Sequence, residues 1–203
     1  MIATRSPHDS EVARLQKQND TKFILGVTAK LLIISTVTAL LLSCVNALTE
    51  NKIAENAQKE KNEAIAAIFP DATASELYGE PIEGVTELYM VFADDAALGY
   101  AAQVAPLGFG GEMTVMVGVT TDGDVAGVKL ISHSETPGLG NRVGEADYLS
   151  QYIGKDPRSL AEGIDVITGS TISSKAILAG VESALAAFGT VFSENDTAVG
   201  GAQ

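Results

Sequence analysis

The chain has 203 residues and carries 26 acidic against 13 basic side chains, a formal net charge of −13. Proteins bind nucleic acids through positively charged surfaces and aromatic side chains that stack on the bases. The acidity of this chain and its lack of tryptophan therefore disfavour nucleic acid as a partner. The length predicts one domain of ordinary size plus a membrane segment, and 46% hydrophobic residues suffice for a core. The single cysteine, Cys44, excludes an intrachain disulfide and a metal cluster held by this chain alone, and we expect no metal site.

The N-terminal part of the chain has the pattern of a membrane anchor. Residues 23–48 are nearly all apolar with Lys30 as their one charge, and the uncharged run 31–48 covers 18 residues, close to the length that crosses a bilayer. Five basic residues lie up to and including Lys30, against three just beyond the run, which favours a cytoplasmic N-terminus. We predict a cytoplasmic segment over 1–22, a transmembrane helix over 23–48, and an extracytoplasmic remainder.

Two other interpretations of the apolar run remain open. The first is a cleaved signal peptide, although the preceding polar segment is long and no small-x-small cleavage site is clear after the run. The second is a lipoprotein, because Leu41-Leu42-Ser43-Cys44 faintly resembles a lipoprotein cleavage box with Cys44 as the acceptor. The uncleaved single-pass anchor in the cell membrane fits the sequence better than either.

The remainder predicts a stalk followed by an α+β domain. Residues 49–84 form a helical stalk and connector, with a helix over 49–69 that Pro70 ends. Over 85–193 we predict an antiparallel sheet with helices on one side, because hairpin turns separate successive apolar runs. The expected strands are 88–92, 100–104, 113–119 and 125–132, followed by a short helix near Tyr148 and Tyr152, a final helix over 173–188, and a flexible tail over 194–203.

One stretch near the end combines a carboxylate, hydroxyl groups and a glycine. Asp165 precedes Thr168, Ser170, Thr171 and Ser173, and an apolar stripe with four-residue spacing begins shortly afterwards. Hydroxyl caps followed by a buried stripe are typical of a helix N-terminus, where free N–H groups and the helix dipole favour a phosphate. The same residues also fit a capped helix without a ligand.

This stretch resembles the flavinylation motif of the membrane redox proteins RnfG and NqrC, Asp-x-x-Ser/Thr-Gly-Ala/Ser-Thr before a helix. The resemblance implies one FMN per chain, joined covalently through its phosphate, as a phosphoester, to Thr171. Thr168, Gly169 and Ser170 occupy the neighbouring motif positions, with Ser170 where alanine is commoner. The resemblance also implies a separate flavin transferase that uses FAD. Asp165 is a candidate for recognition by that enzyme, or a turn residue that bonds its own backbone.

A second motif points to the same family. Residues 135–140 read Glu-Thr-Pro-Gly-Leu-Gly, which is the family's second signature without a departure, and a glycine-rich turn at 106–111 precedes it. The resemblance covers about residues 85–188 and implies that this loop lies against the flavin. Its candidate cofactor contacts are Glu135, Thr136, Gly138 and Leu139.

The resemblance implies an electron-carrying flavoprotein subunit of the Rnf complex, a membrane-bound, ion-translocating ferredoxin:NAD⁺ oxidoreductase. The expected partners are the other proteins of the Rnf complex, including a second flavinylated membrane protein, and the flavin transferase during maturation. We expect no catalytic residue and no complete reaction from this chain alone. The alternatives are NqrC of a Na⁺-translocating NADH:quinone reductase, a stand-alone anchored extracytoplasmic flavoprotein, and a membrane-tethered non-redox module that binds a phosphorylated ligand.

Overall fold

A computed structural model describes residues 7–79, 82–94, 96–160 and 162–199. The chain divides into two compact units, Met1–Asn56 and Ala57–Gln203. The first element, α1 (Pro7–Ile68), is one continuous helix. The predicted stalk helix is therefore not a separate element, although it ends just before Pro70, as expected for a residue that lacks a backbone N–H.

In the first unit, α1 presents apolar side chains that no described part of the protein covers. Leu31, Leu32, Ile33 and Ile34 are each at least 60% exposed. The hydroxyl of Thr36 donates to the carbonyl of Leu32 over 2.8 Å, so this hydroxyl has a hydrogen-bond partner without water. Within Phe23–Ile68, an 18-residue window has a mean hydropathy of 2.2, and none of the residues in that window is buried. A helix long and apolar enough to cross a membrane thus lies where the sequence predicts it, while its orientation stays a prediction.

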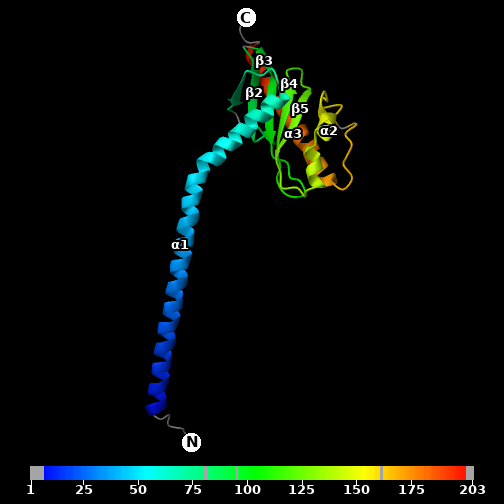
Figure 1. The fold of residues 1–203 in the computed structure, drawn as a ribbon. Coiled ribbons are helices and arrows are strands. Elements are labelled where there is room, and N and C mark those ends of the chain that lie inside the picture. The colour runs from blue at the N-terminus through cyan, green and yellow to red at the C-terminus, as the bar shows by residue number, and fades with distance from the viewer. Residues whose placement is uncertain (1–6, 80–81, 95, 161, 200–203) are drawn as a thin grey trace. The chain divides into compact units, whose positions relative to one another are not determined.

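The second unit is built on a five-stranded antiparallel sheet, which confirms the α+β class. The strands pair in chain order, each antiparallel to the next (Figure 1). Their bounds are β1 Ala74–Tyr78, β2 Glu87–Ala93, β3 Ala96–Val104, β4 Thr114–Thr120 and β5 Val125–Ser132. The sequence did not predict β1, whose side chains are mostly exposed and lack an apolar alternation.

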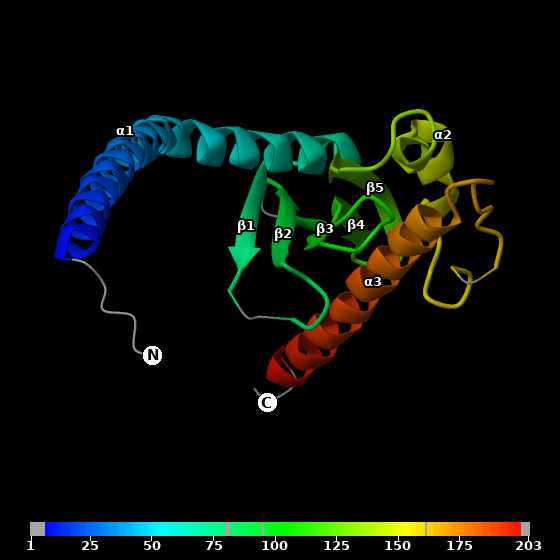
Figure 2. The same ribbon diagram turned by 90° about the horizontal axis from the view of Figure 1, so that it is seen from below.

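Helices cover both faces of the sheet, so the prediction of helices on one side was wrong. The last helix, α3 (Thr171–Val199), packs one face through Ile177, Val181 and Leu185, and the end of α1 packs the other through Ala64 and Ile65 (Figure 2). The physical reason is visible in β4, an interior strand of the sheet. Its side chains alternate between the two faces, yet five consecutive residues, 115–119, are buried, so both faces need cover.

The remaining elements connect the sheet to α3. The chain after β5 forms the short turns η1 (Gly140–Gly144), α2 (Ala146–Leu149) and η2 (Ser150–Tyr152), so a short helix forms where one was predicted. Tyr148 and Tyr152 are buried, and their hydroxyls lie 3.0 Å apart. The helix α3 begins two residues before the predicted start and continues past Phe188 to Val199. The flexibility predicted for 194–203 stays a prediction.

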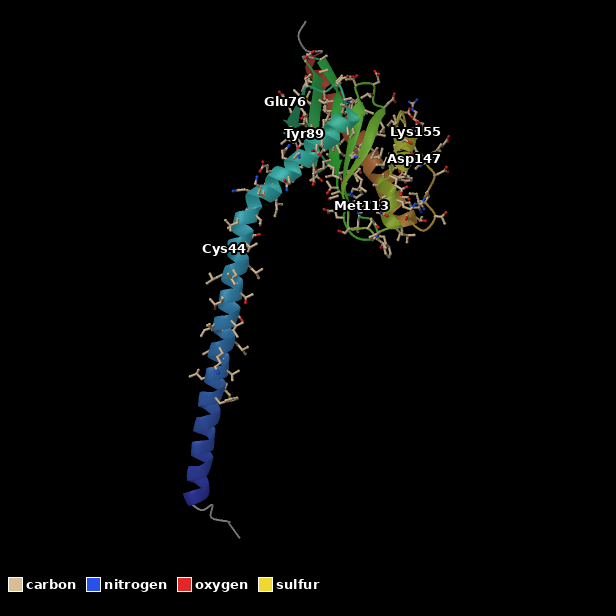
Figure 3. The ribbon with its side chains drawn as sticks, in the orientation of Figure 1. Cys44, Glu76, Tyr89, Met113, Asp147 and Lys155 are labelled. Carbon is tan, nitrogen blue, oxygen red and sulfur yellow. The ribbon has the colours of Figure 1, made fainter. Side chains whose placement is uncertain are left out.

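The contact between α1 and the sheet includes a partly buried ion pair. Lys61 Nζ lies 2.8 and 2.7 Å from the two carboxylate oxygens of Glu87, and the hydroxyl of Tyr89, labelled in Figure 3, also donates to Glu87. Burial raises the pKa of Glu87, but the hydrogen bonds from Lys61 and Tyr89 outweigh it and hold that pKa below its ordinary value near 4.5.

We expect Glu87→Gln to destabilise the domain by about 1 kcal/mol at pH 7, a figure that allows for solvent screening of a side chain that is 30% exposed. Because folding lowers the pKa of Glu87, its contribution is present above pH 4.5 and is lost as the pH falls through the folded-state pKa. Urea unfolding at several pH values should show the difference between variant and wild type shrinking in acid. An equally large difference at pH 3 and pH 7 would contradict this account.

Candidate cofactor site

A pocket of about 280 Å³ lies where α3 begins, and three separate segments line it. The glycine-rich turn after β3 contributes one residue, the segment after β5 contributes four, and the turn into α3 together with the first residues of that helix contributes five. In chain order the lining residues are Phe109, Glu135, Thr136, Leu139, Gly140, Gly169, Ser170, Thr171, Ile172 and Ser173. The fold therefore brings together the two motifs that the sequence analysis singled out, although about 30 residues of chain separate them.

A larger hollow of about 520 Å³ lies farther along α3, between Gly180 and the segments around Val85 and Pro106. It is lined by small and apolar residues, and no lining residue carries a titratable group. The smaller pocket holds the carboxylate and the exposed hydroxyl group on which cofactor chemistry could act, so it is the better candidate site.

The first turn of α3 leaves the hydroxyl of Thr171 accessible. Gly169 has a φ of +86°, a left-handed conformation that glycine adopts without strain, and the Ser170 N–H donates to the carbonyl of Ile167 over 2.9 Å. This turn directs the chain into α3, whose first residue is Thr171, and Thr171 is exposed. The first N–H groups of a helix have no partner within the helix, so a phosphate on Thr171 would lie beside free donors.

Ser170 joins the two motifs directly. Its side chain is buried, and its hydroxyl donates to the backbone carbonyl of Leu139 over 2.6 Å. An alanine at this position would lack the hydroxyl that makes this bond. In this chain the serine therefore holds the loop after β5 against the start of α3.

We expect Ser170→Ala to leave the attachment of a cofactor at Thr171 intact but to destabilise the fold by about 1 kcal/mol, the usual net value of one hydrogen bond. The free energy of unfolding from urea titration and the flavin content of the same preparation measure the two effects. Loss of the cofactor with unchanged stability would show that Ser170 serves binding and does not serve packing.

Glu135 is the buried carboxylate of the site. Only 5% of the residue is exposed, and its Oε1 accepts the Gly110 N–H over 3.2 Å. Its Oε2 has no hydrogen-bond partner among the residues that the structure describes. A Cβ added at Gly108 would lie 2.1 Å from Oε1, and one added at Gly140 would lie 2.2 Å from Oε2. The glycine-rich turn therefore encloses this carboxylate, together with Gly140 from the loop.

The other predicted site residues divide into two groups. Thr136 and Leu139 line the pocket, whereas Gly138, Thr168 and Asp165 do not. Gly138 shapes the loop, because it has a φ of +77° and its N–H donates to the side-chain oxygen of Asn141 over 2.7 Å. Thr168 is exposed, and so is Asp165, whose own N–H donates to Gln151 Oε1 over 2.8 Å. These placements leave the binding role of each residue a prediction.

Sequence reasoning did not select four residues that line the pocket: Phe109, Gly140, Ile172 and Ser173. Phe109 and Ile172 are 71% and 55% exposed, so they give the pocket apolar walls that solvent can reach. Ser173 is 1% exposed, and its hydroxyl has no partner in the described part of the chain. A serine within a helix can donate to the carbonyl four residues earlier, as Ser183 does with Ala179. Ser173 lies too near the start of α3 for a helical carbonyl at that position, so its lack of a partner is recognised only once the start of the helix is known.

These features fit FMN. An exposed hydroxyl at a helix N-terminus suits a phosphoester, and the walls formed by Phe109, Leu139 and Ile172 suit a flat aromatic ring. The unpartnered oxygens of Glu135 and Ser173 offer an acceptor and a donor for the polar atoms of such a ring system.

Known proteins with similar sequences agree with this assignment. Residues 108–186 match the sequence profile of the FMN-binding domain. The G subunit of the Na⁺-translocating ferredoxin:NAD⁺ oxidoreductase complex of Acetobacterium woodii is 31% identical, in an alignment that covers 81% of this chain and 91% of that protein. The chain belongs to the RnfG family, the G subunits of ion-translocating oxidoreductase complexes. It carries an FMN-binding domain, and the family resemblance drawn from the two motifs is confirmed.

Other relatives carry the same kind of name. The G subunit of the proton-translocating ferredoxin:NAD⁺ oxidoreductase complex of Clostridium ljungdahlii is 26% identical, with 84% of this chain and 95% of that protein covered. Among solved structures, NqrC of Shewanella oneidensis is similar with a TM-score of 0.43 and 20% identity, covering 56% of this chain and 65% of that one.

Proposed function

We propose that this chain is the electron-carrying flavoprotein subunit of an Rnf complex, a membrane-bound, ion-translocating ferredoxin:NAD⁺ oxidoreductase, with one FMN attached covalently to Thr171. The observation that carries the proposal is the exposed hydroxyl of Thr171 at the N-terminus of α3, on the rim of a pocket that both sequence motifs line. The relationship to the named G subunits supports the complex.

Attachment of the cofactor is a phosphoryl transfer. The Thr171 oxygen forms a bond to the FMN phosphorus of FAD, the pyrophosphate bond breaks, AMP leaves, and the hydroxyl proton is lost. A threonine hydroxyl is a weak nucleophile, so a flavin transferase supplies the activation. Asp165 is exposed six residues before the acceptor and is available for that enzyme to recognise. Thr168, Gly169 and Ser170 complete the recognised turn.

Once attached, the isoalloxazine ring takes up and releases one or two electrons, and the protein positions it. Phe109, Leu139 and Ile172 would cover apolar parts of the ring, while Thr136 and Glu135 would hydrogen-bond its polar edge. Gly138 sets the turn that brings Leu139 to the pocket. The covalent bond keeps the cofactor in a compartment where a lost FMN could not be replaced.

The proposed layout places residues 1–22 in the cytoplasm and 23–48 across the cell membrane. Residues 49–84 then form the stalk and connector, 85–193 the extracytoplasmic FMN-binding domain, and 194–203 a flexible tail. The exposed apolar surface of α1 supports the membrane segment, and the excess of basic residues before it supports the orientation. The proposed partners are the other proteins of the Rnf complex, including a second flavinylated membrane protein.

The function is tested in cells that make the complex. Deleting the gene should abolish ferredoxin-dependent NAD⁺ reduction by isolated membranes; the wild-type gene should restore it, and the Thr171→Ala gene should not. Membranes that keep full activity without the gene would favour a stand-alone flavoprotein. Loss of NADH:quinone reduction in its place would favour an NqrC role, and a protein without flavin from a host with active transferase would favour a non-redox binding module.

A further inference from the structure

The carboxylate of Glu135 is buried without a counter-charge. Among the described residues, four ion pairs form, and none of them includes Glu135. Its one side-chain hydrogen bond is to the Gly110 N–H, at 3.2 Å, and Oε2 has no partner. Burying a carboxylate that is not fully bonded is costly, so a side chain kept in this state needs a reason beyond folding.

The chain also leaves space for this carboxylate at the pocket. Side chains at Gly108 and Gly140 would occupy the space that its two oxygens take, since the added Cβ atoms would lie 2.1 and 2.2 Å from them. A Cβ at Gly110 would lie 2.2 Å from the carbonyl oxygen of Ser134, so this glycine too is needed for the turn to approach the loop. Three glycines from two segments thus leave the room that this acidic side chain needs at the pocket.

We propose that Glu135 sets the reduction potential of the FMN bound in this pocket and holds it low. The inference rests on the proposed function, because it requires the flavin to occupy the pocket that Glu135 lines. Each electron added to the ring adds negative charge beside a buried carboxylate. Repulsion between like charges is strong where water is excluded, so the reduced ring is disfavoured and donates its electron more readily.

The test is a redox titration of the full-length, FMN-loaded protein, followed by its flavin absorbance. Glu135→Gln keeps the shape of the side chain and removes the charge, so we expect its potential to rise. The expected change is about tenfold in the one-electron equilibrium, which corresponds to about 59 mV. Glu112→Gln is the matched control, because Glu112 follows the same glycine-rich turn but does not line the pocket, and its potential should stay at the wild-type value.

A loaded Glu135→Gln protein whose potential equals that of Glu112→Gln, or falls below it, would overturn the proposal. If Glu135→Gln yields no folded flavoprotein, Glu135→Asp decides. This variant keeps the negative charge but moves it one methylene farther from the flavin. The potential of its FMN should therefore rise, but by less than the roughly 59 mV expected when the charge is removed. An unchanged or lower potential contradicts the proposed role of Glu135. A wild-type protein without bound flavin would instead contradict the proposed function, so the two failures are distinguishable.

Discussion

Thr171→Ala is expected to yield protein that folds, inserts into the membrane and carries no covalent FMN. The loss should be complete, because the variant has no oxygen at the position where the phosphoester forms. Stability should change by less than about 0.5 kcal/mol, since the side chain is exposed and lies at the first residue of α3. Flavin fluorescence of the band on a denaturing gel, from a host with active flavin transferase, measures the attachment.

Ser173→Ala is the control for that experiment. It removes a hydroxyl two residues away in the same helical turn, and it should retain the fluorescent band, because Ser173 is buried and is not the acceptor. A Thr171→Ala protein as fluorescent as the wild type would refute the assigned acceptor. If Ser173→Ala alone were dark, the phosphoester would belong to Ser173.

Cysteine labelling in intact cells should show the domain outside the cytoplasm. Cys44 is the single cysteine, so Cys44→Ala gives a background without thiols. In that background a membrane-impermeant maleimide should label Glu162→Cys, which lies at an exposed position of the domain, without permeabilisation. Ser6→Cys, in the predicted cytoplasmic segment, should react only after the membrane is opened. The effect is all or none, because a polar domain does not change sides of a bilayer.

The opposite labelling pattern would reverse the orientation. The size of the Cys44→Ala protein tests the two processing alternatives. The wild type and the Cys44→Ala variant are compared. An uncleaved anchor predicts the full-length mass in both proteins, and a signal peptide predicts a shorter mature chain in both. A lipoprotein predicts a processed chain only in the wild type, where Cys44 is present.

The parts of the fold that follow from local pattern were predictable. The stripe of Ile177, Val181 and Leu185 specified α3 and the face it buries, and all three are buried against the sheet. The apolar run specified the membrane-type helix in α1, and Pro70 marked where that helix ends. Each of these signals lies within one short segment, where spacing along the chain determines which side chains share a face.

The parts that depend on contacts between distant segments were not predictable in the same way. The strand β1 is an edge strand with exposed side chains, and only its pairing with β2 makes it a strand. The glycine-rich turn had the composition of an ordinary loop, and its role as an enclosure for Glu135 becomes visible only when residues 27 positions apart in the chain, Gly108 and Glu135, lie together. Ser173 was within the motif, but its lack of a partner depends on where α3 begins.

The central claim is that one FMN is joined through its phosphate to Thr171, and intact-mass spectrometry of protein purified from its own cells tests it most directly. The account predicts a mass equal to the polypeptide plus one FMN minus one water, with the added mass on the peptide that contains Thr171 after proteolysis. A mass equal to the polypeptide alone, or the same addition on a peptide without Thr171, would contradict it.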